Sequence, residues 1–299
     1  MQRALHHLLT APPPAHPLCS LDAWWTHHAE LARRFDVPIE LALVGGFSAD
    51  RLGYAFASGY QAAAAALFPR SDVPAALAAT EAGGVHPRAI HTRLSESKLD
   101  GEKTFVTLGS YAQRFLVVAQ KGQTADGRPE LCVVSIDRRP GVTLIEREPT
   151  PFAPEIPHAR LVLEAVAVAR DEVLPGDGYD VYLKPFRTVE DTHVLASLLG
   201  YLVGVGRKSG WPEATIERLV AAAVVLATLA ASDPSSDATH VALAGALSLV
   251  RELLDEIEPL WERVDAETAE RWKRDRVLLT VANSAREKRR EAAWRRLRQ

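Results

Sequence analysis

Apolar residues recur every three or four positions over the first 70 residues, which is the period of an amphipathic helix. One predicted helix follows Ser20, whose hydroxyl is suited to cap its first turn. A second begins at Ser48 or Asp50 and ends before Pro69, and its small residues would let another helix approach closely. Residues 1–70 are therefore predicted to form an N-terminal helical domain.

The pattern changes over residues 71–182, where short apolar runs are separated by glycine and proline. Several runs alternate between apolar and polar positions and are rich in valine, leucine and phenylalanine, which is typical of strands. Asp100-Gly101 is predicted as a hairpin turn, and the segments 125–129 and 138–142 as further turns. No helix is predicted between the strands, so the region is expected to form an antiparallel β-barrel or sandwich.

Helical periodicity returns over residues 183–299. Four stretches with apolar stripes and short connectors predict a C-terminal four-helix bundle. The first helix is expected to begin at Thr188, with acidic residues in its first turn, and the last to run unbroken from Asp265 to Leu297. The order of helices, β domain and helical bundle predicts an α+β fold.

The composition is that of an ordinary globular protein, with 47% hydrophobic and 24% charged residues in a chain of 299. A net charge of −3 gives no general attraction to nucleic acid or to an anionic membrane. The basic stretch Arg286–Arg298 is interpreted as a solvated helix end, although such a helix can also contact phosphate.

Targeting and redox signals are few. The longest apolar run, Leu219 to Ala231, is too short to span a bilayer, and the N-terminus lacks the apolar segment of a signal peptide. Cys19 and Cys132 lie far apart, which argues against a disulfide framework. We therefore expect a cytoplasmic protein without a membrane span.

Two short stretches carry candidate chemistry. Thr80-Glu81 stands before Gly83-Gly84, so backbone N–H groups of this loop could face a ligand, although a plain loop has the same pattern. Phe105 and Thr107 are two positions apart and would share one face of a strand. Such a pair can flank a planar ring ligand, but it can equally be a core aromatic beside a surface threonine.

A metal site has weaker support. Glu190 and His193 have the ligand spacing of di-iron carboxylate proteins, which need a second such pair on another bundle helix. The other pair with this spacing, Glu155 and His158, lies in the predicted β region and has a proline inside it. No metal is therefore expected.

Taken in order, the motifs resemble those of the acyl-CoA dehydrogenase family. The Thr-Glu loop is followed by "GEKTFVTLGSYAQRFLVVA", and then by "EAVAVARDEVLPGDGYDVYL" at the exit of the β domain. Most of the strand motif fits the family pattern, namely Lys103, Phe105, Val106, Thr107, Gly109 and Ala112. Leu108 and Gln113 depart from it. The resemblance covers nearly the whole chain and includes the order of the domains.

The resemblance implies an FAD site at the junction of the β domain and the C-terminal bundle. Phe105, Val106 and Thr107 would contact the flavin ring, with the threonine hydroxyl near N5. The loop at Ala79 and Thr80 would hold the pyrimidine edge. The implied reaction is α,β-dehydrogenation of an acyl-CoA or similar thioester, in which a carboxylate removes the α proton and a hydride passes to the flavin.

Counting back from Leu198–Gly200, Glu190 occupies the position where some members of the family keep this base. The alternative is that Glu190 only complements the dipole of the helix start. The resemblance also implies a homo-oligomer and an electron-transfer flavoprotein as the electron acceptor. The alternative function is a non-catalytic relative that has lost flavin and serves as a subunit or binding module.

Overall fold

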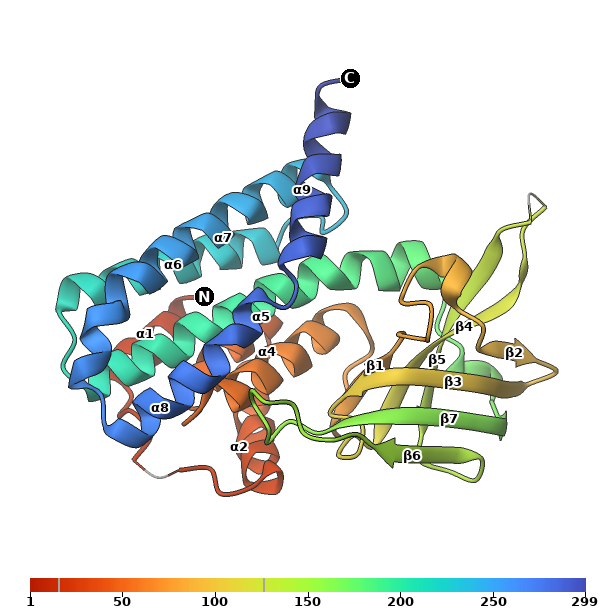
Figure 1. The fold of residues 1–299 in the computed structure, drawn as a ribbon, viewed down its shortest axis with the longest axis horizontal. Coiled ribbons are helices and arrows are strands. Elements are labelled where there is room, and N and C mark those ends of the chain that lie inside the picture. Colours follow the sequence, from red (N-terminus) through yellow and green to blue (C-terminus); the bar gives the residue numbers. More distant parts are fainter. Residues whose placement is uncertain (16, 126) are drawn as a thin grey trace. The chain divides into compact units, whose positions relative to one another are not determined.

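The computed structural model describes residues 1–15, 17–125 and 127–299. Helices precede and follow a central sheet, which confirms the predicted fold class (Figure 1). The chain divides into two compact units. The helical unit comprises Met1–Ala66, Pro151–Ala153 and Thr188–Gln299, and the β unit comprises Leu67–Thr150 and Pro154–Arg187. The division into domains at residues 1–70, 71–182 and 183–299 stays a prediction.

The first helices of the chain are α1 (Gln2–Thr10), α2 (Leu21–Arg34), α3 (Pro38–Phe47) and α4 (Leu52–Leu67). Ser20 caps α2 as predicted, because its hydroxyl accepts a hydrogen bond from the Ala23 N–H. The sequence pattern missed α3, whose apolar residues do not follow a helical stripe because the whole helix is buried.

Glycines allow these helices to lie very close to α5 (Lys184–Lys208). A Cβ atom at Gly46 would stand 1.9 Å from the Ser197 carbonyl oxygen, and one at Gly59 would stand 2.7 Å from the Val194 Cα. The close approach predicted from the small residues of α4 is therefore found, and its partner is the helix that carries Glu190.

The remaining helices are α6 (Glu213–Ala230), α7 (Asp237–Ile257), α8 (Ala266–Asp275) and α9 (Asn283–Leu297). The prediction of one unbroken helix from Asp265 to Leu297 is wrong, because a 3-10 turn separates α8 from α9. The break follows Asp275, a fully buried residue whose carboxylate accepts a hydrogen bond of 2.7 Å from the Ala153 N–H. This contact fixes the end of α8 to a distant part of the chain.

The β unit contains a seven-stranded sheet. The strands are β1 (Ala75–Ala78), β2 (Arg93–Ser95), β3 (Lys98–Thr107), β4 (Arg114–Gln123), β5 (Pro129–Asp137), β6 (Val142–Glu146) and β7 (His158–Ala167). The order is β1-β4-β2-β3-β7-β6, with β5 also on β4. The sheet is mixed rather than purely antiparallel, because β4 runs parallel to β1 and to β2. The β2–β3 hairpin intervenes between β1 and β4 and lets the chain return in the same direction.

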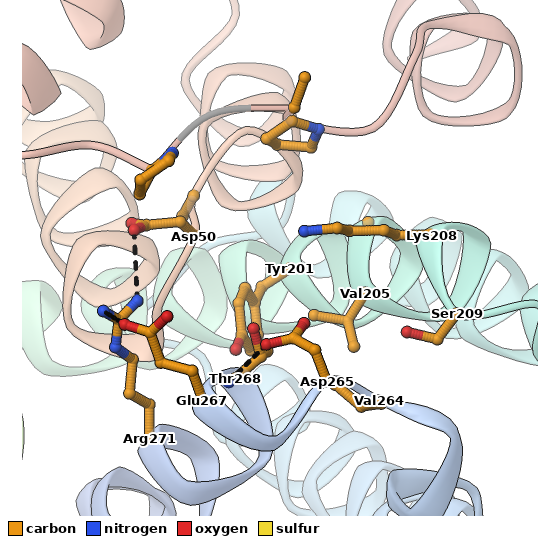
Figure 2. Close-up of a pocket in the computed structure, with 15 residues that line it drawn as sticks. Asp50, Tyr201, Val205, Lys208, Ser209, Val264, Asp265, Glu267, Thr268 and Arg271 are labelled. Carbon is orange, nitrogen blue, oxygen red and sulfur yellow. Dashed lines mark hydrogen bonds and ion pairs between the residues drawn. The ribbon is translucent and has the colours of Figure 1, made fainter.

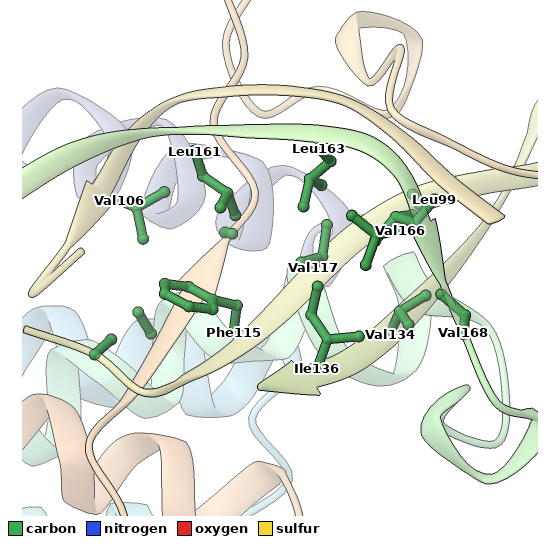
Figure 3. Packing of buried hydrophobic residues seen from close by; sticks show 14 of the residues in the cluster. Leu99, Val106, Phe115, Val117, Val134, Ile136, Leu161, Leu163, Val166 and Val168 are labelled. Carbon is green, nitrogen blue, oxygen red and sulfur yellow. The ribbon is translucent and has the colours of Figure 1, made fainter. Parts of the chain in front are cut away.

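Side chains from one face of the sheet pack against one another to form the core, in which Val106, Phe115 and Val117 are completely buried (Figure 3). The hairpin turn between β2 and β3 lies at Glu96 and Ser97, which adopt positive φ. The predicted turn at Asp100-Gly101 is therefore wrong, since both residues are inside β3.

No helix in the part of the chain that the structure describes has both the length and the apolar character needed to cross a membrane.

Candidate functional site

Strand β3 directs alternate side chains to opposite faces of the sheet. The Val106 side chain is completely buried in the core, whereas Phe105 is 38% exposed and Thr107 is partly buried. Phe105 and Thr107 thus alternate with the core residue, in agreement with the predicted strand. Because the Val106 side chain points into the core, only its backbone remains available for a ligand.

The loop that contains Ala79 and Thr80 lies beside this strand. Thr80 forms an isolated antiparallel bridge with Phe105, and its carbonyl oxygen accepts a 2.8 Å hydrogen bond from the Thr104 N–H. Ala79 is buried and Thr80 is partly buried. The structure therefore brings together two motifs that lie about 25 residues apart in the sequence.

A buried ion pair anchors the loop to β3. The Lys103 Nζ atom donates to Glu81 Oε1 at 2.7 Å and to the Val118 carbonyl oxygen at 2.5 Å. The same carboxylate accepts hydrogen bonds from the backbone N–H groups of His91 and Thr92 and from the Thr92 hydroxyl. The Lys103 side chain is fully buried and that of Glu81 is 6% exposed.

Burial lowers the pKa of Lys103 to about 8, against the opposing effect of Glu81. Burial also disfavours ionised Glu81, but the hydrogen bonds from Lys103 and the loop leave its pKa below the usual value. The pairing of these two residues was not predicted from the sequence. The signal that could have found them is a lysine within an otherwise apolar strand, next to an acidic loop.

Two further side chains surround Phe105. The His158 ring lies 4.3 Å from the Phe105 ring, centroid to centroid, and the Arg147 guanidinium lies 5.5 Å from the same ring. Arg147 also donates to the Thr104 carbonyl oxygen at 3.0 Å. His158 on β7 is the cross-strand partner of Thr107. We call Thr80, Phe105, Thr107 and His158 the candidate face.

His158 is notable because its buried Nδ1 atom has no hydrogen-bond partner within the described residues. Burial and the nearby Arg147 guanidinium lower the pKa of His158 against the opposing effect of a hydrogen bond with the Ile156 backbone, so the ring is neutral at neutral pH. A neutral imidazole with an unused nitrogen is suited to bond a polar ligand atom. In the sequence, His158 was interpreted only as a possible metal ligand, and its pairing with Thr107 was not predicted.

Glu190 belongs to the helical unit and is partly buried on α5. Helix α5 begins at Lys184, after a π-helical turn at Gly178–Leu183 that Asp177 caps, and Thr188 lies buried inside it. The prediction that the helix begins at Thr188 is therefore wrong. Glu190 lies beyond the first turn, which removes the alternative that it complements the helix start, because the dipole effect falls off within one turn.

The neighbours of Glu190 on α5 are held by other contacts. Asp191 accepts hydrogen bonds from Arg286, at 2.8 Å, and from Arg289. His193 is buried and its Nδ1 lies 2.7 Å from the Val189 carbonyl oxygen. Burial lowers the pKa of His193 to about 4, so it is a neutral core histidine. No cluster of three or more potential metal ligands occurs in the described parts of the chain.

No protein-family model matches the sequence, and no curated protein matches it. Solved structures do match. The structure of PigA with FAD and proline has a TM-score of 0.68 at 16% identity, covering 99% of this chain and 92% of that chain. The prolyl acyl carrier protein oxidase AnaB has a TM-score of 0.69 at 16% identity, covering 99% of this chain and 97% of that chain.

A third match is butyryl-CoA dehydrogenase from Megasphaera elsdenii, with a TM-score of 0.67 at 12% identity, covering 92% of this chain and 90% of that chain. The chain therefore has the fold of the acyl-CoA dehydrogenase-like proteins, as the motif resemblance predicted.

Proposed function

We propose that this protein is an FAD-dependent oxidoreductase that introduces an α,β double bond into an acyl thioester. The observation that carries the proposal is the convergence of Thr80, Phe105 and Thr107 on one face of the β unit, beside the unpartnered Nδ1 of His158. These residues belong to separate motifs, and the fold brings them together in a chain with the acyl-CoA dehydrogenase fold.

The residues of the candidate face suit a flavin. Phe105 offers an exposed aromatic surface to a planar ring, and Thr107 offers a hydroxyl beside it. Backbone groups near Ala79 and Thr80 would hold the polar edge of the ring. The Glu81–Lys103 pair fixes this loop against β3 and keeps these groups in position. When bound, FAD supplies the acceptor for the hydride.

Glu190 is the proposed base that removes the α proton of the substrate. A general base needs a carboxylate that is ionised and held in place, and α5 provides a rigid support for it. The adjacent Asp191 binds two arginines, so its charge is largely offset within the bundle.

The proposed substrate class is the acyl thioester. Among proteins of this fold, one is named a butyryl-CoA dehydrogenase and another a prolyl acyl carrier protein oxidase, and both names denote thioester substrates. The proposal extends to an electron-transfer flavoprotein as acceptor, a homo-oligomeric assembly and a cytoplasmic location. Chain length and branching depend on the shape of the substrate pocket.

The test is to purify the protein, add excess FAD, remove free flavin by gel filtration and record the visible spectrum and the thermal stability. We expect retained flavin absorption and a raised unfolding temperature, because a ligand at about 100 times its Kd stabilises the folded state by about 2.7 kcal/mol. Anaerobic addition of butyryl-CoA should then bleach the bound flavin. A colourless protein without a thermal shift would contradict the proposal and favour the non-catalytic alternative.

A further inference from the structure

Two carboxylates that line a pocket in the helical unit are paired with arginines of that unit (Figure 2). Asp50 accepts hydrogen bonds from Arg51 and lies 3.6 Å from an Arg271 nitrogen, and Glu267 also pairs with Arg271. These ion pairs offset the charges within the protein. The β unit differs, because an arginine beside the candidate face has no carboxylate partner among the described residues.

That arginine is Arg147, which directly follows β6. Its guanidinium donates to the Thr104 carbonyl oxygen at 3.0 Å and lies 5.5 Å from the centroid of the Phe105 ring. The side chain is exposed, so a ligand that lies on Phe105 can reach it. Arg160, the arginine on the neighbouring strand β7, is instead bonded to Glu102 at 3.2 Å. Arg147 is therefore an uncompensated cation at the edge of the candidate face.

Strand pairing puts Arg147 on the same side of the sheet as the candidate face. Its N–H donates to the His158 carbonyl oxygen at 2.8 Å, one position beyond the pair of Glu146 with Ala159. His158 is in turn opposite Thr107 on β3. Because residues directly opposite each other on antiparallel strands point to the same side, Arg147, His158 and Thr107 form one row. The adjacent Glu146 points to the other side, since side chains alternate along a strand.

The charge of Arg147 already acts on this row of side chains. After burial, it is the second cause of the lowered pKa of His158. The same charge would act on a planar ring that lies against Phe105, because the interaction between two charges falls off only in proportion to their separation. A ring that becomes negatively charged on the candidate face would therefore be stabilised relative to the same ring in its neutral form.

We propose that Arg147 raises the reduction potential of the flavin by stabilising the negative charge of the reduced ring. The inference rests on the proposed function, which places the flavin on the candidate face. The hydride that the acyl thioester loses brings two electrons and one proton to the neutral oxidised ring, which becomes an anion, while the α proton goes to the base. A charge near the ring is one of the means by which a protein tunes a flavin. By linkage, Arg147 changes the potential only if it favours the reduced ring over the oxidised one.

The experiment measures two quantities on the full chain, namely the affinity for oxidised FAD and the potential of bound FAD in anaerobic reduction against a reference dye. Arg147→Gln removes the charge but keeps a donor for the Thr104 carbonyl oxygen, and Arg147→Lys keeps the charge. We expect Arg147→Gln to lower the equilibrium constant for reduction about tenfold, which is about 30 mV for a two-electron couple. Its affinity for oxidised FAD should stay within about threefold of the wild type, and Arg147→Lys should keep the wild-type potential.

Lys121→Gln is the matched control, because it removes a cation from β4 of the same unit, where Lys121 pairs with Glu130 at 3.0 Å. It should keep the wild-type potential. If Arg147→Gln binds FAD with the wild-type potential, this inference is overturned and the proposed function stands.

Three other results would also count against the inference. Equally low potentials in Arg147→Gln and Arg147→Lys would show that the charge is not the cause. Loss of oxidised FAD in Arg147→Gln alone would mean that Arg147 serves binding rather than reduction. Absence of FAD binding by the wild type would overturn the proposed function, and this inference with it.

Discussion

Two buried carboxylates, Glu81 in the β unit and Asp191 in the helical unit, are held in different ways. In the β unit, Lys103 and Glu81 are removed from solvent, and Lys103 is the only side-chain cation that the Glu81 carboxylate contacts among the described residues. In the helical unit, Asp191 binds both Arg286 and Arg289, and all three keep some exposure. Glu81 therefore depends on a single cation, whereas Asp191 has a spare partner for its charge.

The difference matters for function because each charge cluster lies next to a proposed functional group. The Glu81–Lys103 pair supports the Thr80 loop, and Asp191 is adjacent to Glu190 on α5. The candidate face should therefore be more sensitive to a single substitution in its support than the proposed base is.

The largest expected effect comes from breaking the single pair. Lys103→Met should lower the free energy of unfolding by about 3–5 kcal/mol, because it leaves Glu81 buried without its counter-charge. Arg289→Met is the matched control and should cost below about 1 kcal/mol, because Asp191 keeps Arg286. Urea denaturation followed by circular dichroism measures both. Equal losses in the two variants would contradict the comparison.

The proposed base gives the next largest effect. Glu190→Gln should slow the reduction of bound flavin by an acyl-CoA by about 10²-fold or more, equivalent to about 2.7 kcal/mol, while FAD binding stays unchanged. Stopped-flow absorbance measures the rate. Glu213→Gln, at the exposed start of α6, is the control for loss of a carboxylate in the same unit. An unchanged rate in Glu190→Gln would remove Glu190 as the base.

Acid should weaken the helical unit through its buried histidines. Burial lowers the pKa of His28 and of His193 to about 4, below the value of 6.5 in the unfolded chain. Below pH 6.5 the unfolded chain binds protons that the folded chain does not, so stability falls until the pH reaches about 4. Between pH 7 and pH 5 each histidine should contribute about 2 kcal/mol to this loss.

The check is the pH dependence of the free energy of unfolding in His28→Gln. Between pH 7 and pH 5, the free energy of unfolding of this variant should fall by less than that of the wild type, and the difference should equal the contribution of one histidine. A wild-type slope in His28→Gln would mean that His28 titrates normally.

The smallest effect concerns His158, which the structure adds to the candidate face. His158→Asn should weaken FAD binding by about fivefold to tenfold, the usual value of one hydrogen bond, and His91→Asn, at an exposed site in the same unit, should not. Fluorescence quenching on titration with FAD gives both affinities. Equal affinities in the two variants would exclude a flavin contact by His158.

The features that were predicted correctly from the sequence are those that depend on local periodicity. The order of helices and strands, the Ser20 cap and the strand that carries Phe105 and Thr107 all follow from residues close together in the chain. The resemblance to the acyl-CoA dehydrogenase family then predicted the fold that structural comparison bears out.

Most of the features that were predicted wrongly from the sequence depend on contacts between residues that are distant in the chain. The end of α8 is fixed by Asp275 and Ala153, which are 122 residues apart. Gly101 lies inside β3, where a glycine is required because a Cβ atom would approach the Thr92 Cα of the neighbouring chain segment to 2.6 Å. The start of α5 was predicted too late because Pro185 is tolerated in a first helical turn, so it did not mark a boundary.

The most direct test of the central claim is calorimetric titration of FAD into the wild type and into the double variant Phe105→Ala, Thr107→Val. Both substitutions lie on the candidate face and leave the buried Val106 untouched. We expect saturable binding by the wild type and at least tenfold weaker binding by the double variant, with the same circular dichroism spectrum. Equal affinity in the two proteins would contradict the claim that this face holds the flavin.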